Sequence, residues 1–528
     1  MFRKKFTFKI LIFLILSLIT NANGLNEDYL QRRSDLLQKE EQLRLGANIT
    51  LNEDEIKVNN TFMAFKNEEL LIGFKNPKRN IPGIHFFKGI SQMKADSKIY
   101  RFLKKMPKGA VLNLHAMSSV SSGWFTKNVS YTPGLWNCTN STLTFRKKED
   151  MNCTLVSEER KKYGSEYDKL FESLVNLYSR TPEVTYPNKR VVWDRYKTMY
   201  YTIFDALNYL PVFRAFHWRM LEELYNDNIM YAEIRLDFFP LYDENKKIYP
   251  ANQSIIELLD IEKKFKEKYP EFFGIKLIHS IIRSHNDTII KHQLKEFVNY
   301  QAAYPDFIIG LDMVGHEDRG RRLLDFVEDF NNLPNSTKFF FVAGETNRLG
   351  STDLNLVDAM LLNATRIGYG YALNKHPVLM KEIKERDIAI EVCPISNQIQ
   401  KLLLDLRNHP AAMFMSRNIP MVISNDAPGF WNAQGLSYDY YYAIMSLASN
   451  QDGLKTLKQL VWNSIKYSAL SEEKKKKAEE MLQKQWNKFI KDILKDPDFK
   501  FSKHRRYTRE ERGRGERERK TSNYPKQN

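Results

Sequence analysis

The chain of 528 residues is 42% hydrophobic and 13% aromatic, so it can bury a large core, which excludes a disordered protein. Its formal net charge of +17 gathers at the two ends. Residues 1–24 carry four basic side chains and no acidic one, and residues 501–528 carry ten basic and four acidic ones. The body between them has a charge of about +7 and no recognition motif, which argues against nucleic-acid binding.

The first 24 residues have the layout of a secretory signal. A basic start is followed by the apolar run ILIFLILSLI and the small-residue exit TNANG, which predicts cleavage after Ala22 or Gly24. A membrane anchor is the alternative, but the run is shorter than the roughly 20 residues that a span needs. Sequons for N-glycosylation agree with export, and they lie at Asn48, Asn59, Asn128, Asn137, Asn140, Asn152, Asn252, Asn286, Asn335 and Asn363. We therefore expect a secreted, extracellular glycoprotein.

Residues 25–105 carry Leu and Ile at helical spacings and predict an N-terminal helical domain. In residues 106–495, apolar runs rich in β-branched and aromatic residues alternate with helical stretches. The candidate strands are 110–116, 231–236, 275–282, 307–313, 338–344, 366–370, 388–392 and 420–424. Eight buried strands with helix-sized connections favour an α/β fold of the (β/α)8 TIM-barrel type over a doubly wound sheet. Residues 500–528 predict a basic, disordered tail.

The connection after the first strand is oversized, at about 115 residues. It contains Cys138, Cys153 and four of the sequons. In an oxidising compartment we expect these two cysteines to form a disulfide that closes an inserted subdomain over residues 127–186. Cys393 follows the apolar run IAIEV and is expected to remain a buried thiol. A zinc–thiolate site is poorly supported because the chain has no CxxC pair.

Polar residues follow the candidate strands, at the ends that converge on one mouth of a barrel. They are His115, the GHED string of residues 315–318, Glu345, Tyr369 and Asp426. A zinc hydrolase built at such a mouth needs three or four nitrogen or oxygen ligands, a position for water and a carboxylate that moves protons.

Long strings from residue 26 to about residue 489 carry a family resemblance. They are MPKGAVLNLHA, VVWDRYKTMYYTIFDALNYLPVFR, MYAEIRL, GLDMVGHED, AGETN, LLNATRIGYGYALNKHP, IEVCPISNQ and VISNDAPGFW. In these strings the chain closely resembles the adenosine deaminase-related growth factor family. This family consists of secreted proteins and includes insect growth factors and adenosine deaminase 2-like proteins. The resemblance implies a metal-dependent deaminase barrel, a homodimer formed through the N-terminal helices, and an insertion that corresponds to the family's receptor-binding domain.

The resemblance also implies a zinc site, and this sequence departs from it at two of four ligands. The family's first strand ends in His-x-His, both of which bind zinc, whereas here Asn113 and His115 stand there. The fifth strand's zinc-binding His is replaced by Val342. The eighth strand's first aspartate, also a ligand, matches Asp426. The two ligands that remain, His115 and Asp426, predict that zinc is absent or weakly bound.

The positions that handle protons and the nucleoside are altered in the same way. Glu345 matches the proton-transferring glutamate, but Tyr369 replaces the histidine that activates water. Ala116 and Ala427 replace aspartates that contact nucleoside or purine. Trp193 matches a tryptophan of the nucleoside pocket and is equally compatible with packing. The unperturbed pKa of a tyrosine, near 10, makes it a weak substitute for histidine as a base.

Several other interpretations stay open at this stage. For Glu345, a structural hydrogen-bonding role or no remaining role is favoured over that of a catalytic acid. For His115 and Asp426, pairing with each other is favoured over zinc binding. For His316, in the GHED string, a structural role is favoured. Arg348 stands where the family commonly has an aromatic residue.

We therefore expect a secreted, catalytically degenerate relative of adenosine deaminase, a pseudoenzyme that acts as an extracellular signalling or binding protein. Its expected partners are a second copy of itself and a cell-surface receptor or polyanionic glycan. The sequence gives little support to adenosine binding. One alternative is an active zinc-dependent adenosine deaminase that forms inosine at an altered metal site. Another is a sink for nucleosides or polyanions that uses the empty pocket or the basic tail.

Overall fold

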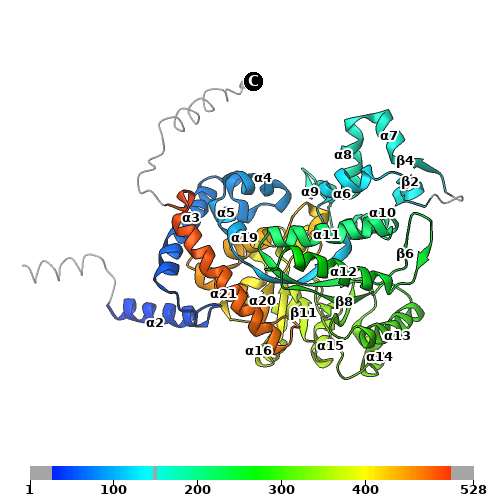
Figure 1. Cartoon of the computed structure of the whole chain (residues 1–528). Coiled ribbons are helices and arrows are strands. Elements are labelled where there is room, and N and C mark those ends of the chain that lie inside the picture. The colour runs from blue at the N-terminus through cyan, green and yellow to red at the C-terminus, as the bar shows by residue number, and fades with distance from the viewer. Residues whose placement is uncertain (1–26, 147–150, 501–528) are drawn as a thin grey trace, which may run out of the picture.

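The computed structural model describes residues 27–146 and 151–500 of the chain (Figure 1). The predicted signal segment and the basic tail lie outside the described residues. Within these residues no helix has the length and the apolar character that crossing a membrane requires.

Helices occupy the region before the first strand: α2 (Glu27–Leu43), α3 (Glu53–Lys75), α4 (Phe86–Asp96) and α5 (Lys98–Lys105). Helix α3 begins with a capping box, in which the side chains of Asn52 and Glu55 each accept a hydrogen bond from the other residue's backbone N–H, both at 2.9 Å. Phe62 of α3 and Phe102 of α5 pack with ring centroids 4.9 Å apart, in the core. Helix α2, in contrast, buries no residue. The expectation that this region forms a dimer stays a prediction.

Eight strands occupy the predicted positions. They are β1 (Gly109–His115), β5 (Ile229–Leu236), β8 (Gly274–Ile282), β9 (Ile308–Val314), β10 (Val342–Ala343), β11 (Arg366–Tyr369), β12 (Ala389–Val392) and β13 (Met421–Ile423). They form two four-stranded sheets, in the orders β1-β5-β8-β9 and β10-β11-β12-β13, with parallel pairing throughout. The predicted α/β fold with parallel sheets is confirmed.

The two sheets meet at both of their edges, but only through isolated bridges. Leu114 of β1 pairs with Asp426 beyond β13, and Leu311 of β9 pairs with Phe339 before β10, both in parallel. At the first edge the N–H of His115 donates to the carbonyl of Asp426 at 2.8 Å. The structure therefore does not show one continuous, closed ladder of eight strands, which is the finer form that the sequence predicts.

The strand predicted at 338–344 is much shorter in the structure, where only Val342–Ala343 form β10. Some backbone groups of this segment bond to buried side chains instead of to a neighbouring strand. The carbonyl of Phe340 accepts from the guanidinium of Arg235 at 3.0 Å, and the N–H of Val342 donates to the carboxylate of Asp312 at 2.8 Å. The apolar run predicts burial correctly, but it does not predict these partners.

Helices surround the strands in Figure 1. They are α6 (Ser122–Asn128), α10 (Lys189–Leu207), α11 (Leu210–Asn226), α12 (Gln253–Lys268), α13 (Asp287–Ala303), α14 (Val327–Asn331), α15 (Asn355–Leu361), α16 (Pro377–Glu385), α17 (Pro394–Ile399), α18 (Ala411–Ser416), α19 (Ser437–Tyr442), α20 (Leu454–Lys466) and α21 (Glu472–Lys495). Helix α20 contacts both β1 and β13 and so covers one edge where the two sheets meet. A short hairpin, β6 (Leu241–Tyr242) and β7 (Ile248–Tyr249), precedes α12.

The connection after β1 contains a small sheet of its own, in the upper right of Figure 1. Strands β2 (Trp136–Cys138), β3 (Thr142–Thr144) and β4 (Cys153–Leu155) pair antiparallel, and α7 (Val156–Tyr163), α8 (Ser165–Leu174) and α9 (Pro182–Thr185) follow. Cys138 and Cys153 lie opposite each other on β2 and β4 and form a disulfide, as predicted. Cys393 is a buried free thiol, also as predicted.

Five charged side chains lie buried between the two sheets and tie them together: Glu233, Arg235, Asp312, Arg366 and Glu391. We call them the interior charge network. Arg235 of β5 donates to Asp312 of β9 at 2.5 Å and to Glu391 of β12 at 2.7 Å. Arg366 of β11 donates to the same Glu391 at 2.7 Å and to Glu233 of β5 at 2.5 Å. Each guanidinium thus bridges the two sheets through charge-assisted hydrogen bonds.

Candidate functional site

The carboxyl ends of the strands surround a cavity of about 460 Å³, which we call the mouth cavity. His115 ends β1 and Tyr369 ends β11, while Glu345 and Asp426 follow β10 and β13. All four line the mouth cavity, together with Val342, and so does the predicted pocket residue Trp193 of α10. The structure therefore brings together residues that are more than 300 positions apart in the sequence, at the end of the sheets where α/β proteins place their sites.

Two of these residues sit on strained backbone. Tyr369 and Asp426 have φ angles of 64° and 58°, in the left-handed region that residues with a side chain rarely adopt. Such conformations cluster at functional sites, where the surrounding structure holds them in place. The backbone conformation of Tyr369 and Asp426 is therefore of the kind found at functional sites.

His115 and Asp426 face each other across the seam between the sheets. The Nε2 atom of His115 lies 3.3 Å from Oδ1 of Asp426, and Oδ2 of Asp426 accepts from Ser396 at 2.7 Å. Burial, assisted by the charge of Arg235, lowers the pKa of His115 to about 3. Burial raises the pKa of Asp426 to about 6, against the hydrogen bonds from Ser396 and Tyr369. At neutral pH the pair is therefore a neutral imidazole beside a carboxylate.

The other positions at which the sequence departs from the family provide few atoms that could bind a metal ion. Asn113 is fully buried, and neither its amide oxygen nor its amide nitrogen has a hydrogen-bond partner. Val342 packs in a small apolar cluster with Val314, Tyr369 and Cys393. Ala116 and Ala427 are both fully buried and contribute only methyl groups.

This donor set does not fit a zinc ion. Protein zinc sites use three or four nitrogen, oxygen or sulfur ligands. At the four positions of the family's zinc ligands, the mouth offers the imidazole of His115, the carboxylate of Asp426, a neutral amide at Asn113 and a hydrocarbon side chain at Val342. Among the described residues, no group of three or more His, Cys, Asp or Glu side chains has the geometry to hold a metal ion.

Glu345 is an almost fully buried carboxyl group whose Oε1 atom has no hydrogen-bond partner. Burial raises its pKa well above the usual value, and the charges of Asp426 and Glu317 raise it further, while Lys189 opposes them. The raised pKa favours the protonated form of this side chain. A buried neutral carboxylic acid can donate a proton or a hydrogen bond to a ligand, which is the chemistry that the mouth retains.

Two residues that hold Glu345 in place were missed in the sequence. Glu317 accepts hydrogen bonds from the backbone N–H groups of Gly344 and Glu345, at 2.9 and 2.6 Å. Lys189 donates to the carbonyl of Glu345 at 2.7 Å and to the carboxylate of Asp318 at 3.0 Å. The signal for Glu317 was present, because it belongs to the GHED string that drew attention only to His316. No sequence pattern pointed to Lys189.

His316 lies beside Trp193 on the wall of the mouth cavity, with ring centroids 5.1 Å apart. Neither nitrogen of His316 nor the indole nitrogen of Trp193 has a hydrogen-bond partner. Burial and the charge of Lys189 lower the pKa of His316 to about 4, so the ring is neutral at neutral pH. These nitrogen atoms are unsatisfied polar groups at the surface of the cavity, where a ligand would complete their bonding.

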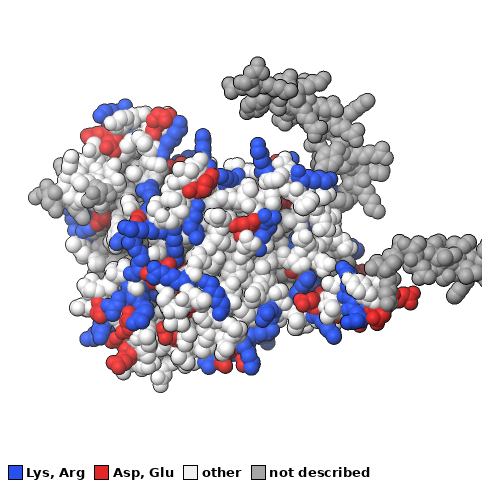
Figure 2. Space-filling model, turned by 180° about the vertical axis from the view of Figure 1, so that it is seen from behind, with Lys and Arg blue, Asp and Glu red and all other residues white. Residues whose placement is uncertain are grey.

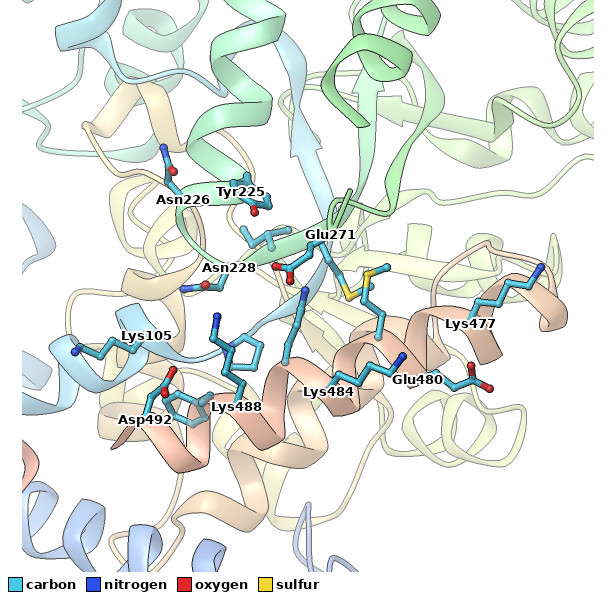
Figure 3. Close-up of a pocket in the computed structure, with 16 residues that line it drawn as sticks. Lys105, Tyr225, Asn226, Asn228, Glu271, Lys477, Glu480, Lys484, Lys488 and Asp492 are labelled. Atoms are coloured by element: carbon cyan, nitrogen blue, oxygen red, sulfur yellow. The ribbon is translucent and has the colours of Figure 1, made fainter. Parts of the chain in front are cut away.

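A larger hollow, of about 740 Å³, lies at the other end of the strands beside α21 (Figure 3). Its labelled charges include both signs, among them Glu271, Lys488 and Asp492. Figure 3 shows Lys105 and Lys477 directed away from its centre. None of the described residues that line it has an unpaired buried polar atom. The mouth cavity is therefore the better candidate for a functional site.

Comparisons with known proteins show which family the chain belongs to. Residues 168–485 match the family described as adenosine deaminase, and residues 8–103 match the adenosine/AMP deaminase N-terminal family. Adenosine deaminase 2 of Sus scrofa is 38% identical over 489 residues, covering 88% of this chain and 95% of the relative. The adenosine deaminase of Lutzomyia longipalpis is also 38% identical, over 88% of this chain and 93% of the relative.

Solved structures share the fold at low identity. The Arabidopsis protein ADAL, solved in a complex with IMP, matches with a TM-score of 0.54 and 14% identity over 74% of this chain and 99% of its own. A zinc-bound amidohydrolase from Burkholderia matches with a TM-score of 0.50 and 15% identity over 75% of this chain and 95% of its own. The resemblance seen in the sequence strings is confirmed by the curated relatives.

Proposed function

Since this chain belongs to the adenosine deaminase family, we propose that it is a catalytically degenerate member, a pseudoenzyme that acts as an extracellular binding or signalling protein. We take its two sheets to form the eight-stranded barrel of metal-dependent deaminases. The observation that carries the proposal is Val342. By the family resemblance this side chain stands at the position of a zinc-binding histidine, and it is packed among Val314, Tyr369 and Cys393. An apolar cluster at this point leaves a metal ion without a ligand from β10.

The chemistry of deamination explains why these changes matter together. Attack of water on the purine requires a bound metal ion to lower the pKa of the water, and a base to take its proton. The resemblance assigns the base to the position of Tyr369. Burial raises the pKa of this hydroxyl well above 10, so it does not take up protons at neutral pH. Glu345 remains as a proton donor, but it has no activated water to serve.

The rest of the chain supports export and binding. The predicted signal, the sequons and the Cys138–Cys153 disulfide suit an oxidising extracellular compartment. The insertion with its own small sheet and the N-terminal helices correspond to the regions that the family resemblance links to a receptor and to dimer formation. We therefore propose a secreted homodimer whose partner is a cell-surface receptor or a polyanionic glycan.

A turnover assay tests the loss of catalysis. Purified chain supplied with zinc is incubated with adenosine, with adenosine deaminase 2 of Sus scrofa as the positive control. Because single catalytic groups typically contribute about 10²-fold or more, we expect kcat/KM to be lower than that of the pig enzyme by about 10⁴-fold or more. Inosine formation within about tenfold of the control would overturn the proposal.

One observation favours a second function, an active deaminase with an altered metal site. Glu345 keeps the burial and the raised pKa of a catalytic acid, and His115 and Asp426 remain close together. Chelator treatment separates the two functions. Turnover that disappears with chelator and returns with zinc supports the active enzyme, whereas background turnover that ignores the chelator supports the degenerate one.

A further inference from the structure

One wall of the mouth cavity is aromatic. Trp193, Tyr196, Tyr200 and Tyr201 of α10 all line it. The rings of Trp193 and Tyr196 lie 5.2 Å apart between centroids, and Tyr200 and Tyr201 lie 5.6 Å apart. Planar heterocycles bind to such walls by stacking, which is tolerant of the identity of the ring. The wall therefore suits a flat, unsaturated ring.

Basic side chains gather around the opening of this cavity. Lys197 and Arg319 line it directly. Arg319 is 48% exposed and lies 3.0 Å from Asp194, which also meets Arg190 at 3.7 Å. A single carboxylate thus faces two guanidinium groups. Because one negative charge cannot neutralise both, this side of the opening keeps a net positive charge.

A second carboxylate near the opening, Asp318, is shared between basic side chains in the same way. Asp318 accepts from Lys189 at 3.0 Å and lies 3.8 Å from Arg348, which is 58% exposed. We call five basic residues the basic rim: Lys197 and Arg319, which line the cavity, and Lys189, Arg190 and Arg348, which pair with Asp318 or Asp194 beside it. Figure 2 shows Lys and Arg side chains gathered in the left half of one face of the molecule, with Asp and Glu among them. The field at the basic rim therefore attracts anions.

Residues that line the same cavity carry unsatisfied nitrogen atoms. The indole nitrogen of Trp193 and both ring nitrogens of His316 are buried without a partner. An indole N–H is only a donor, and a neutral imidazole donates from one of its nitrogens. Phosphate oxygens accept several such hydrogen bonds at once, and guanidinium groups add charge-assisted ones.

We propose that the mouth cavity binds a planar ring that carries a phosphate group. The ring lies against the aromatic wall of α10, and the phosphate lies at Arg319, Lys197 and Arg348 on the basic rim. This inference rests on the proposed function, since it names the ligand of a protein that binds at this site without turnover. A neutral nucleoside would leave the positive charge of the basic rim without a counterpart.

Binding measured by calorimetry tests the inference with adenosine 5′-monophosphate, adenosine and inorganic phosphate as probes. We expect the monophosphate to bind about tenfold or more tightly than adenosine at low salt, because hydrogen bonds to charged groups are the stronger ones. The difference should shrink as salt is raised. Inorganic phosphate alone should bind weakly, because it has no ring to stack.

A double variant locates the site, and a matched control isolates the effect of charge. Arg319→Gln with Arg348→Gln should reduce the preference for the monophosphate to about threefold or less. Both side chains are exposed, so the fold should survive, which circular dichroism checks. Arg386→Gln is the control, because Arg386 is similarly exposed, at 42%, and pairs with Glu382 on α16 outside the cavity. It should leave all affinities unchanged.

The other outcomes overturn the inference. Equal affinity for adenosine and the monophosphate, or no binding of either, removes the phosphate site. Equal or tighter binding of inorganic phosphate or of a heparin disaccharide assigns the basic rim to polyanions instead of a ring-bearing ligand. Ammonia release, measured in the same samples, reports separately on the proposed loss of turnover, so the two failures are distinguishable.

Discussion

The interior charge network and the mouth cavity lie at two levels of the same strands and differ in how their polar groups are satisfied. In the network, Arg235 and Arg366 bond to three carboxylates and to backbone carbonyls. At the mouth, Glu345, Asn113 and His316 each keep a buried polar atom without a partner. We infer from this difference that the network holds the two sheets together, whereas polar side chains at the mouth can be replaced without loss of the fold.

Removing a cation from the network should have the largest effect. Arg235→Met removes the guanidinium that donates to both Asp312 and Glu391 and leaves these carboxylates buried. Breaking a buried ion pair in this way costs about 3–5 kcal/mol. We therefore expect a loss of that size in the free energy of unfolding, measured with urea. Arg214→Met is the control, because Arg214 also donates two hydrogen bonds to carboxylate oxygens, both of them on Glu257, but is 55% exposed. The control should lose about 1 kcal/mol or less. Equal losses would contradict the comparison.

A carboxyl group near the mouth should make stability depend on pH. Asp237 follows β5, accepts only from Gln293 and the N–H of Phe238, and has its pKa raised to about 7 by burial. Between its unfolded pKa of 3.8 and about 7, the folded chain binds the extra proton. The free energy of unfolding therefore falls as pH rises through this window, on the order of 3 kcal/mol. Asp237→Asn should flatten this dependence, which urea titrations at pH 4 to 7 measure. If the free energy of unfolding changed equally with pH in the natural chain and in Asp237→Asn, the role of Asp237 would be refuted.

Replacing the unsatisfied acid at the mouth should have the smallest effect. Glu345→Gln exchanges a buried carboxyl group, whose raised pKa favours the neutral form, for an amide of the same shape, and it leaves the backbone bonds to Glu317 intact. We expect the free energy of unfolding to change by about 1 kcal/mol or less. A loss as large as that of Arg235→Met would show that the mouth, like the network, is needed for the fold.

The sequence predicts the strands well because each is a short buried run with polar residues at its end. It also predicts the pairing of Cys138 with Cys153. It predicts too long a strand at β10, where the carbonyl of Phe340 and the N–H of Val342 bond to side chains that come from distant strands.

The sequence likewise predicts some features of the candidate site and not others. The changes at Asn113, Val342 and Tyr369 were visible in strings that resemble the family, because each string fixes a position. The packing of Val342 against Cys393 and the reach of Lys189 to Glu345 were not visible. Both depend on side chains that meet only after the chain has folded.

The most direct measurement is the zinc content of the purified chain after incubation with zinc and gel filtration. Asn113→His, Val342→His, Tyr369→His and Ala427→Asp together form the repaired chain, which restores the ligands and the base of the family. We predict far less than one zinc ion per chain for the natural sequence and about one for the repaired one. One zinc ion per natural chain, with both His115 and Asp426 required to hold it, would contradict the proposed loss of the metal site.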